Sequence, residues 1–295
     1  MASTKDLQSR IKSVKSTRQI TKAMQMVSAS KMKRAEIEAK KIDPYVEMLF
    51  EIVRYLRIPP SYSNPLIKKS KNTRSILFLV VGPSRGFVGG LTTDLTLKVN
   101  NLENELKKRY SGVMIDAITL NKVAFNICKN LGLNVVKNFE KLPEHPTTTN
   151  LSPILKTVLD LYLEGHYQMV YIIYTKFISK LKRQPESSIV LPIDFEILLK
   201  ESKERDEPLE HVNEFIYEPS VSEVLDSLLP EYFETNILNA ILQNNASEHS
   251  ARMIAMQTAT DNANQLIDDL TLLYNRERQS AITNSIIEIT SARIE

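Results

Sequence analysis

The fold of this chain is decided by residues 31–56, which read KMKRAEIEAKKIDPYVEMLFEIVRYL. Alternating steps of three and four residues from Met32 meet only apolar or small side chains as far as Leu56. That spacing is typical of a helix that buries a narrow stripe against a second helix, with a left-handed supercoil. The stretch therefore predicts one half of a coiled coil.

The same register extends back toward the N-terminus without a slip. Between Arg18 and Ser28 its positions are polar or small, so we expect looser packing there. The complete set is Leu7, Ile11, Val14, Arg18, Thr21, Gln25, Ser28, Met32, Ala35, Ala39, Ile42, Val46, Leu49, Val53 and Leu56. Pro44 removes a helical hydrogen bond and predicts a kink, and the prolines within residues 58–60 predict the end of the helix.

A second apolar pattern, near the C-terminus, mirrors the first. Its positions are Met256, Ala259, Ala263, Leu266, Leu270 and Leu273, resuming at Ile287 and Ile294 after a polar interruption. Ser220 with Glu223 predicts a capping box at the start of this helix, and Pro230 predicts an early break. The two arms predict an antiparallel pair closed by the segment between them. A helix of about 55 residues spans roughly 80 Å, so we expect the pair to project from the body or to thread through something.

The middle of the chain has a different character. All seven glycines lie between Gly82 and Gly165, and four of them fall within residues 82–90. Glycine is costly inside helices and useful in turns, so a compact centre between helical arms is indicated. Strand patterns occur at 75–81, 112–120, near Val135, 170–178 and 188–195, and helix patterns at 91–110, 121–130 and 151–163, the last with Ser152 and Pro153 at its start.

The alternation of strands and helices predicts an α/β fold with a largely parallel sheet. We expect a polar turn at 182–185 between the last two strands and a solvated charged loop at 200–210. The fold class is therefore α/β: a Rossmann-like central domain plus a long antiparallel coiled coil. The expected domains are an N-terminal helix at 1–58, the central domain at 74–217 and a C-terminal helix at 220–295.

Composition excludes several classes of protein. Cys128 is the only cysteine, which rules out an internal disulfide framework, and its apolar neighbours indicate a buried side chain. The four histidines lack the spacing of a metal site. No apolar run approaches about 18 residues, and the basic N-terminus has no secretory apolar region. We expect a reducing compartment, or attachment to a membrane through other proteins.

Charge is distributed unevenly along the chain. Residues 1–41 carry eleven Lys or Arg against three acids, whereas residues 247–295 carry four Arg against seven acids. The basic arm could bind nucleic acid, an anionic membrane or an acidic protein surface. The first 44 residues contain no aromatic side chain, which disfavours single-strand binding, and the unbroken seam disfavours a membrane-surface helix. Nucleic acid and protein remain open.

The loop at residues 82–90, GPSRGFVGG, follows a strand and precedes a helix, which is where a phosphate-binding loop would lie. It lacks the Lys-Ser/Thr end of a P-loop and the spacing of the dinucleotide fingerprint. A tight turn that packs the strand against a helix is the favoured interpretation. A nucleotide-binding α/β enzyme is the alternative.

Both ends of the chain resemble a known family. Residues 2–32, with TRQITKAMQMVSASKM at 17–32, resemble the opening of gamma subunits of F-type ATP synthase, and SEHSARM at 247–253, ATDNA at 259–263 and YNRERQSAIT at 274–283 resemble their close. Tyr217-Glu218-Pro219 and the glycine loop follow the family order. Ser84 stands where the family usually has an acid, and Ser285 where it usually has Glu.

The resemblance implies a non-catalytic rotor without a cofactor. Its coiled coil would turn inside a ring of three alpha and three beta subunits, and its central domain would be held by the epsilon subunit and the membrane c-ring. It implies no nucleic-acid partner. Residues matched to alpha/beta-ring contacts are Met24, Arg252, Arg278, Gln279, Thr283 and Glu288, and those matched to the c-ring or epsilon side are Phe215, Tyr217 and Glu218.

The resemblance also implies a cellular location. No transit peptide precedes the opening motif, and the cysteine-bearing insertion of chloroplast forms is absent. We therefore expect a bacterial-type subunit, held peripherally at the cytoplasmic face of the inner membrane. It would couple proton flow through the c-ring to ATP synthesis or hydrolysis on beta.

Overall fold

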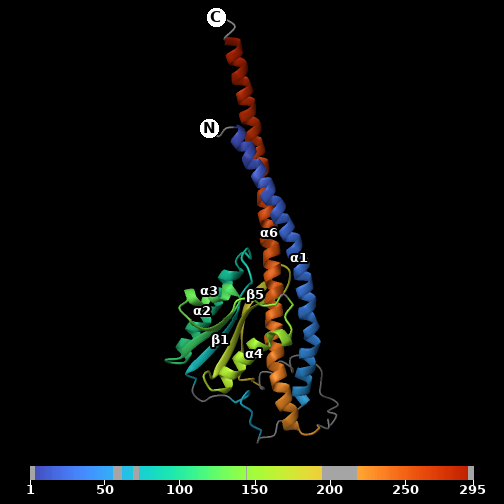
Figure 1. Ribbon diagram of the computed structural model, residues 1–295, viewed down its shortest axis with the longest axis vertical. Helices are drawn as coiled ribbons and strands as arrows, with labels where there is room; N and C mark the ends of the chain where they lie inside the picture. Colours follow the sequence, from blue (N-terminus) through green and yellow to red (C-terminus); the bar gives the residue numbers. More distant parts are fainter. Residues whose placement is uncertain (1–3, 56–61, 69–72, 144, 195–217, 292–295) are drawn as a thin grey trace. The chain divides into compact units, whose positions relative to one another are not determined.

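The computed structural model describes residues 4–55, 62–68, 73–143, 145–194 and 218–291 (Figure 1). It divides into two compact units. The helical unit comprises Met1–Ser30 and Ala251–Glu295, and the α/β unit comprises Lys31–Ser250. Two long helices, α1 (Thr4–Tyr55) and α6 (Val221–Ser291), contribute residues to both units.

A five-stranded sheet in the order β3-β2-β1-β4-β5 forms the α/β unit. Parallel pairing joins β1 to β2, β1 to β4 and β2 to β3, and only β5 runs antiparallel, against β4. The strands are β1 (Ser75–Val81), β2 (Met114–Leu120), β3 (Asn134–Phe139), β4 (Met169–Phe177) and β5 (Arg183–Leu191). The expected α/β layer with a largely parallel sheet is confirmed.

The central strand β1 divides the interior into two cores. Because successive side chains point to opposite faces of a strand, Leu77 and Leu79 join one core, and Ile76 and Phe78 join the other. The first core includes side chains of α4 (Thr148–Leu163) and α6, and the second those of α2 (Leu91–Arg109) and α3 (Lys122–Asn130). The α/β unit therefore has three layers (Figure 1).

The start of one helix and the position of one turn differ by a few residues from those predicted from the sequence. Helix α4 begins after Thr147, not at the predicted Leu151, because Thr147 and Asn150 cap each other. The Thr147 amide donates to Asn150 Oδ1 at 2.8 Å, and the Asn150 amide donates to Thr147 Oγ1 at 3.4 Å. The turn between β4 and β5 lies at 178–182, before the predicted 182–185. Pro185 is instead part of β5, an edge strand where a missing amide is tolerated.

The register predicted for α1 is confirmed over its described side chains. In the helical unit every predicted position from Leu7 to Ser28 is buried or half-buried, and in the α/β unit the same holds from Met32 to Ile42 and at Leu49. The side chains of the remaining positions lie outside the described residues, as does the predicted end at 58–60. The helix continues through Pro44.

The register predicted for the C-terminal helix was partly wrong. Leu266 and Leu273 are 46% and 43% exposed, so they do not belong to the buried stripe. The buried residues are Met256, Thr260, Ala263 and Ile267, continued by half-buried Leu270, Tyr274 and Glu277. A polar residue, Thr260, thus occupies a position that hydrophobicity assigned to Ala259.

The expected break at Pro230 does not occur, because α6 is one helix from Val221 to Ser291. Leu229 and Phe233, on either side of the proline, are 3% and 1% exposed in the core, and this packing offsets the hydrogen bond that proline removes. Ser220 precedes the helix: its Oγ accepts from the Glu223 amide at 3.3 Å and donates to the Glu223 carboxylate at 3.1 Å. The Ser220–Glu223 cap is thus present.

Candidate functional site

The carboxyl ends of β1 and β4 form the natural ligand position of this sheet. From β1 the chain continues to β2 and β3 on one side, and β4 lies on the other, so the order reverses between β1 and β4. In open α/β sheets ligands bind beside such a reversal, next to the loop that follows the strand. In this chain that loop is the glycine loop, residues 82–90.

The side chain of Asn244, from α6, fills this position. Asn244 Nδ2 donates to the Gly82 carbonyl at 3.2 Å, and Asn244 Oδ1 accepts from the Thr175 amide of β4 at 3.3 Å. Asn121, which precedes α3, also donates to the Gly82 carbonyl, at 2.9 Å. Asn244 is 0% exposed. A helix of the chain itself therefore bridges the two strand ends.

One turn further along α6, Glu248 holds the loop itself. The Ser84 amide donates to Glu248 Oε2 at 2.7 Å, and the Ser84 hydroxyl donates to Oε1 at 2.5 Å. Glu248 is 2% exposed. The backbone amide that a phosphate-binding loop would offer to phosphate already donates its hydrogen bond to a buried carboxylate. The negative charge of that carboxylate also repels phosphate. This contact argues against the nucleotide-binding alternative.

Close packing at Gly82 fixes the start of the loop. A Cβ atom at this position would lie 2.7 Å from the backbone nitrogen of Ala124 and 2.9 Å from its Cβ. Only glycine therefore lets β1 approach α3 this closely. The expectation of a tight turn that packs the strand against a helix is confirmed, and the helices are α3 and α6.

In the helical unit, the part of the seam predicted to be polar is hydrogen-bonded across the two helices. Thr260 Oγ1 donates to Thr21 Oγ1 at 2.9 Å, and Arg18 donates to Asn264 Oδ1 at 3.4 Å. Moving from Thr21 back to Arg18 on α1 corresponds to moving from Thr260 forward to Asn264 on α6. The two helices are therefore antiparallel in this unit. Continuing these steps places α1's first residue, Thr4, opposite the turn of α6 around Glu277.

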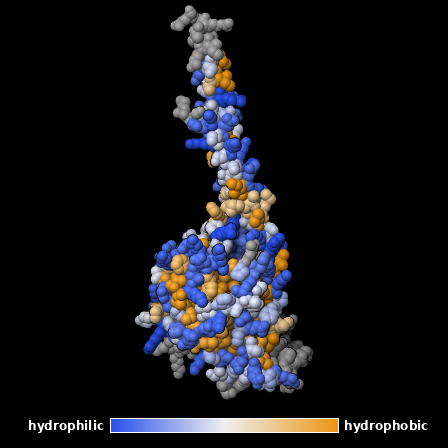
Figure 2. Space-filling model, viewed as in Figure 1, coloured by the Kyte–Doolittle hydropathy of each residue, from blue (hydrophilic) through white to orange (hydrophobic). Residues whose placement is uncertain are grey.

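The described turns of α6 after Glu277 extend beyond the described start of α1. Three large apolar side chains lie exposed there: Ile282, Ile286 and Ile287 are 51%, 59% and 56% exposed. Figure 2 shows apolar side chains interspersed with hydrophilic ones along this end of the helix. These isoleucines give the last described turns of α6 exposed apolar surface between polar side chains.

The structure separates the residues matched to ring contacts into two groups. Met24 and Arg252 are half-buried in the helical unit. Arg278, Gln279 and Thr283 are exposed on α6 and lie about 39 to 47 Å further along that helix than Arg252, at 1.5 Å per residue. The side chain of Glu288 lies outside the described residues.

The three residues matched to the c-ring or epsilon side are only partly described. Glu218 is exposed immediately before α6. Phe215 and Tyr217 lie outside the described residues. The structure therefore leaves their predicted contacts as predictions.

Sequence reasoning missed Asn244 and Glu248. A signal existed, because the two lie four residues apart and continue the face of Ile237 and Ile241, both 0% exposed. Polar residues that continue an apolar face at helical spacing indicate a buried polar contact. The partner of that contact could not be inferred from local sequence.

Other reactive groups do not form a site. Cys128 is fully buried, and burial, with a smaller effect of the nearby Glu103 carboxylate, raises the pKa of its thiol to about 12, so it is unreactive. Within the described ranges, no three His, Cys, Asp or Glu side chains gather as a metal site requires. In those same ranges no helix combines the length and apolar character needed to cross a membrane.

Comparison with known proteins identifies relatives of this chain. Residues 3–293 match a family model described as ATP synthase. The chain is similar to the ATP synthase gamma chains of Leptothrix cholodnii, at 36% identity, and Variovorax paradoxus, at 37%. Each alignment covers 99% of this chain, and 98% and 97% of the relative, respectively.

Solved structures show the same fold. The rotor of the Euglena gracilis mitochondrial ATP synthase matches with a TM-score of 0.64 and 17% identity, over 95% of this chain and 98% of that chain. A chain from the central stalk and c-ring of the Tetrahymena thermophila mitochondrial enzyme matches with a TM-score of 0.57 and 21% identity, over 81% and 99%.

Proposed function

The chain belongs to the ATP synthase gamma-chain family and is the non-catalytic central-stalk rotor of that complex, and from this premise we propose how its surfaces divide the work. The helical unit stands inside a ring of three alpha and three beta subunits. The α/β unit is held by the epsilon subunit and the membrane c-ring. Proton flow turns the c-ring and this chain together, and ATP is made on beta.

Coupling follows from symmetry. A single asymmetric shaft cannot make the same contacts with three equivalent beta subunits. Each angle of the shaft therefore gives each beta site a different set of contacts and a different nucleotide affinity. Hydrolysis of ATP drives the same linkage in reverse.

Rotation requires contacts that hold the shaft without fixing its angle. The exposed isoleucines on the last described turns of α6 support this role, because apolar contacts have little directional preference. Met24, Arg252, Arg278, Gln279, Thr283 and Glu288 are the residues we assign to the ring. Phe215, Tyr217 and Glu218 are assigned to the c-ring and epsilon side.

We assign the chain to the cytoplasmic face of a bacterial inner membrane, where it is held by its partners. The relatives that support this are bacterial gamma chains. The absence of a spanning helix among the described residues is compatible with indirect attachment.

One observation supports the non-catalytic role most strongly: the ligand position of the sheet is filled by Asn244 and Glu248 of α6. A sheet whose ligand position is closed by its own helix serves as a rigid body. Residues 74–217 then act as the base of the shaft, between its two helices.

Affinity purification of the tagged full-length chain tests the proposal. We expect alpha and beta in threefold excess over the chain, together with epsilon and the c subunit, and ATPase activity in the eluate. Recovery of the chain without alpha and beta, or tight ATP binding by the chain alone, would contradict the assignment.

A further inference from the structure

The polar part of the seam in the helical unit is unlike the apolar turns beside it. The seam positions of α1 are apolar from Leu7 to Val14 and polar from Arg18 to Ser28. Thr260 of α6 is 6% exposed in the seam and lies opposite Thr21, which is half-buried. Burying polar side chains between two helices lowers stability unless each of them finds a partner.

Both threonine hydroxyls find their partners in this register. Thr260 Oγ1 donates to Thr21 Oγ1 at 2.9 Å, and Thr21 Oγ1 donates to the Arg18 carbonyl at 3.0 Å. The Thr260 hydroxyl also lies 2.7 Å from the Met256 carbonyl of its own helix. Since each hydroxyl has one hydrogen, the bond across the seam can run in either direction while the other hydrogen stays on a carbonyl. The pair is therefore satisfied by groups of the two helices themselves.

A second bond makes the contact between the helices directional. Arg18 donates to Asn264 Oδ1 at 3.4 Å, three residues before Thr21 on α1 and four after Thr260 on α6. At 1.5 Å per residue the two bonds are separated by roughly 5 Å along the helices. One bond alone would let a helix pivot about it. Two bonds at different heights fix both the axial position and the rotation of α6 against α1.

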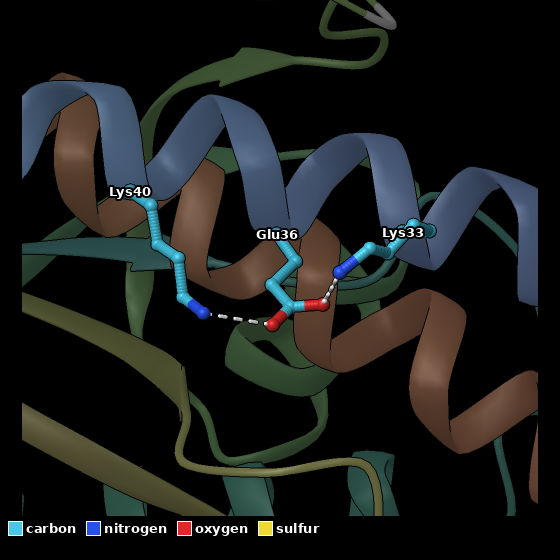
Figure 3. Close-up of polar contacts among 3 residues, drawn as sticks. All are labelled: Lys33, Glu36 and Lys40. Carbon is cyan, nitrogen blue, oxygen red and sulfur yellow. Dashed lines mark hydrogen bonds and ion pairs between the residues drawn. The ribbon is translucent and has the colours of Figure 1, made fainter.

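Polar contacts within a single helix do not have this property. Figure 3 shows Lys33, Glu36 and Lys40 on α1, with the carboxylate between the two ammonium groups. Glu36 Oε2 lies 3.3 Å from Lys33 Nζ, and Glu36 Oε1 lies 3.0 Å from Lys40 Nζ. These partners are three and four residues apart on the same helix, so their pairing is independent of the register. The bond between Thr21 and Thr260, in contrast, depends on it.

The apolar turns of the seam select the register less strictly. Continuing by seven residues from the threonine pair places Val14 opposite Ile267. A local shift of α6 by one heptad, about 10 Å, would still give Val14 a large side chain, Tyr274, to pack on. The same shift would bring Ile267 opposite Thr21, whose hydroxyl would face a side chain that cannot bond to it. A buried polar residue at a seam position is one way in which coiled coils select a register, at a cost in stability.

We propose that Thr21 and Thr260, assisted by Arg18 and Asn264, are positioning residues that fix the register of α1 against α6 while the shaft carries torque. In that role they keep the surface that the two helices present at each angle of the shaft constant. The register itself does not depend on the proposed function, whereas its consequence for coupling rests on that function.

Paired spin labels test the register in the purified full-length chain. In a Cys128→Ala background, cysteines are introduced at Ser16 of α1 and Leu266 of α6, both exposed in the helical unit, and the distances between the labels are measured by pulsed electron paramagnetic resonance. Replacing both threonines by valine keeps the branched shape and removes both hydroxyls. We expect Thr21→Val/Thr260→Val to broaden the distance distribution about twofold or to add a second population, because an apolar seam no longer selects one register.

Two matched variants separate the register from general effects of the substitution. Thr17 and Thr271 each donate to a carbonyl of their own helix, at 3.2 and 2.6 Å. Thr17→Val/Thr271→Val removes these two hydroxyls, one from each helix, and should keep the wild-type distance distribution. Thr21→Ser/Thr260→Ser retains both hydroxyls in the seam and should keep it as well.

Stability and coupling should respond differently to the loss of the pair. Replacing both partners of a buried hydrogen bond by apolar groups of the same shape is nearly neutral or stabilising. Thr21→Val/Thr260→Val should therefore unfold at the wild-type temperature or above it. In the purified complex, the ratio of ATP-driven proton pumping to ATP hydrolysis should nevertheless fall about twofold, because a rotor that has left its register transmits less of its rotation.

The outcomes separate this inference from the proposed function. A wild-type distance distribution in Thr21→Val/Thr260→Val overturns the register role, and so does equal broadening by Thr17→Val/Thr271→Val. A broadened distribution with an unchanged pumping ratio, or a lowered unfolding temperature with normal coupling, overturns the role in coupling. All of these results leave the rotor assignment standing. Failure of the wild-type chain to assemble with alpha and beta contradicts the rotor assignment instead.

Discussion

The backbone amide of Ser84 and the carboxylate of Glu248 are joined by a hydrogen bond of 2.7 Å, although the residues are 164 positions apart. The bond ties the loop after the central strand to the middle of α6. With Asn244 on the Gly82 carbonyl, it anchors the part of α6 that lies in the α/β unit to the sheet. For a rotor this matters, because torque applied to the sheet must reach the helix without slippage.

Glu248→Ala should destabilise the full-length chain by about 3 kcal/mol, because two hydrogen bonds to a charged acceptor are lost at a buried site. Glu248→Gln is the matched control: its amide can still accept from the Ser84 amide and donate to the hydroxyl, so we expect a loss of about 1 kcal/mol. Urea denaturation followed by circular dichroism measures both. If both variants lost the same small amount of unfolding free energy, the contact between Glu248 and Ser84 would not contribute to stability.

Gly82→Ala should cost about 1–3 kcal/mol, because the new methyl group would meet Ala124 in a tightly packed region. Gly86→Ala, in the same loop, should be nearly neutral, since no heavy atom lies within 4 Å of a Cβ there. Thermal unfolding of the two variants is compared directly. If Gly82→Ala unfolds at the wild-type temperature, the close approach of β1 to α3 is not required.

Ile267→Asp should disrupt the helical unit, because this side chain is 8% exposed in the seam and burying a carboxylate there costs its hydration. Leu266→Asp, one residue away but 46% exposed, is the control and should leave the stability of the isolated chain within about 0.5 kcal/mol of wild type. In the assembled complex, Ile267→Asp should lower ATP-driven proton pumping more than ATP hydrolysis. Similar unfolding of both variants would contradict the observed register.

Glu36→Gln should weaken the chain slightly, and only where the wild-type carboxylate is charged. Because its pKa is lowered in the folded chain, mainly by Lys40, the stabilisation is present above the ordinary glutamate pKa and is lost as pH falls through the lowered value. Two helical pairs with exposed lysines contribute less than about 1 kcal/mol. The stability difference between wild type and variant should therefore vanish in acid, and a difference that grows in acid would be inconsistent with the ion pairs.

The sequence alone was sufficient to predict the buried positions of α1, because its heptad spacing is strict. From Leu7 to Ile42 each predicted position is buried or half-buried. Strand β1 was equally clear, since an uninterrupted apolar run bounded by a glycine loop has few other interpretations. In both cases the information is local, and no distant partner is needed to interpret it.

The seam of α6 shows where local information ends. Hydrophobicity favoured Ala259 and Leu266, but the helix buries Thr260, whose hydroxyl meets that of Thr21. Thr260 is stable in the seam because Thr21, another polar residue, faces it. These two residues are 239 positions apart, so their pairing depends on the register between the two helices. The contacts of Glu248 and Asn244 were missed for the same reason.

Rotation of single molecules tests the central claim most directly. The ring of the purified complex is fixed to a surface, and a bead is attached through a cysteine introduced at the exposed position Leu97 of α2, after Cys128→Ala. With ATP present, the account predicts rotation in one direction with three pauses per turn, one for each beta subunit. ATP hydrolysis at the normal rate with a stationary bead, in complexes that retain this chain, would contradict it.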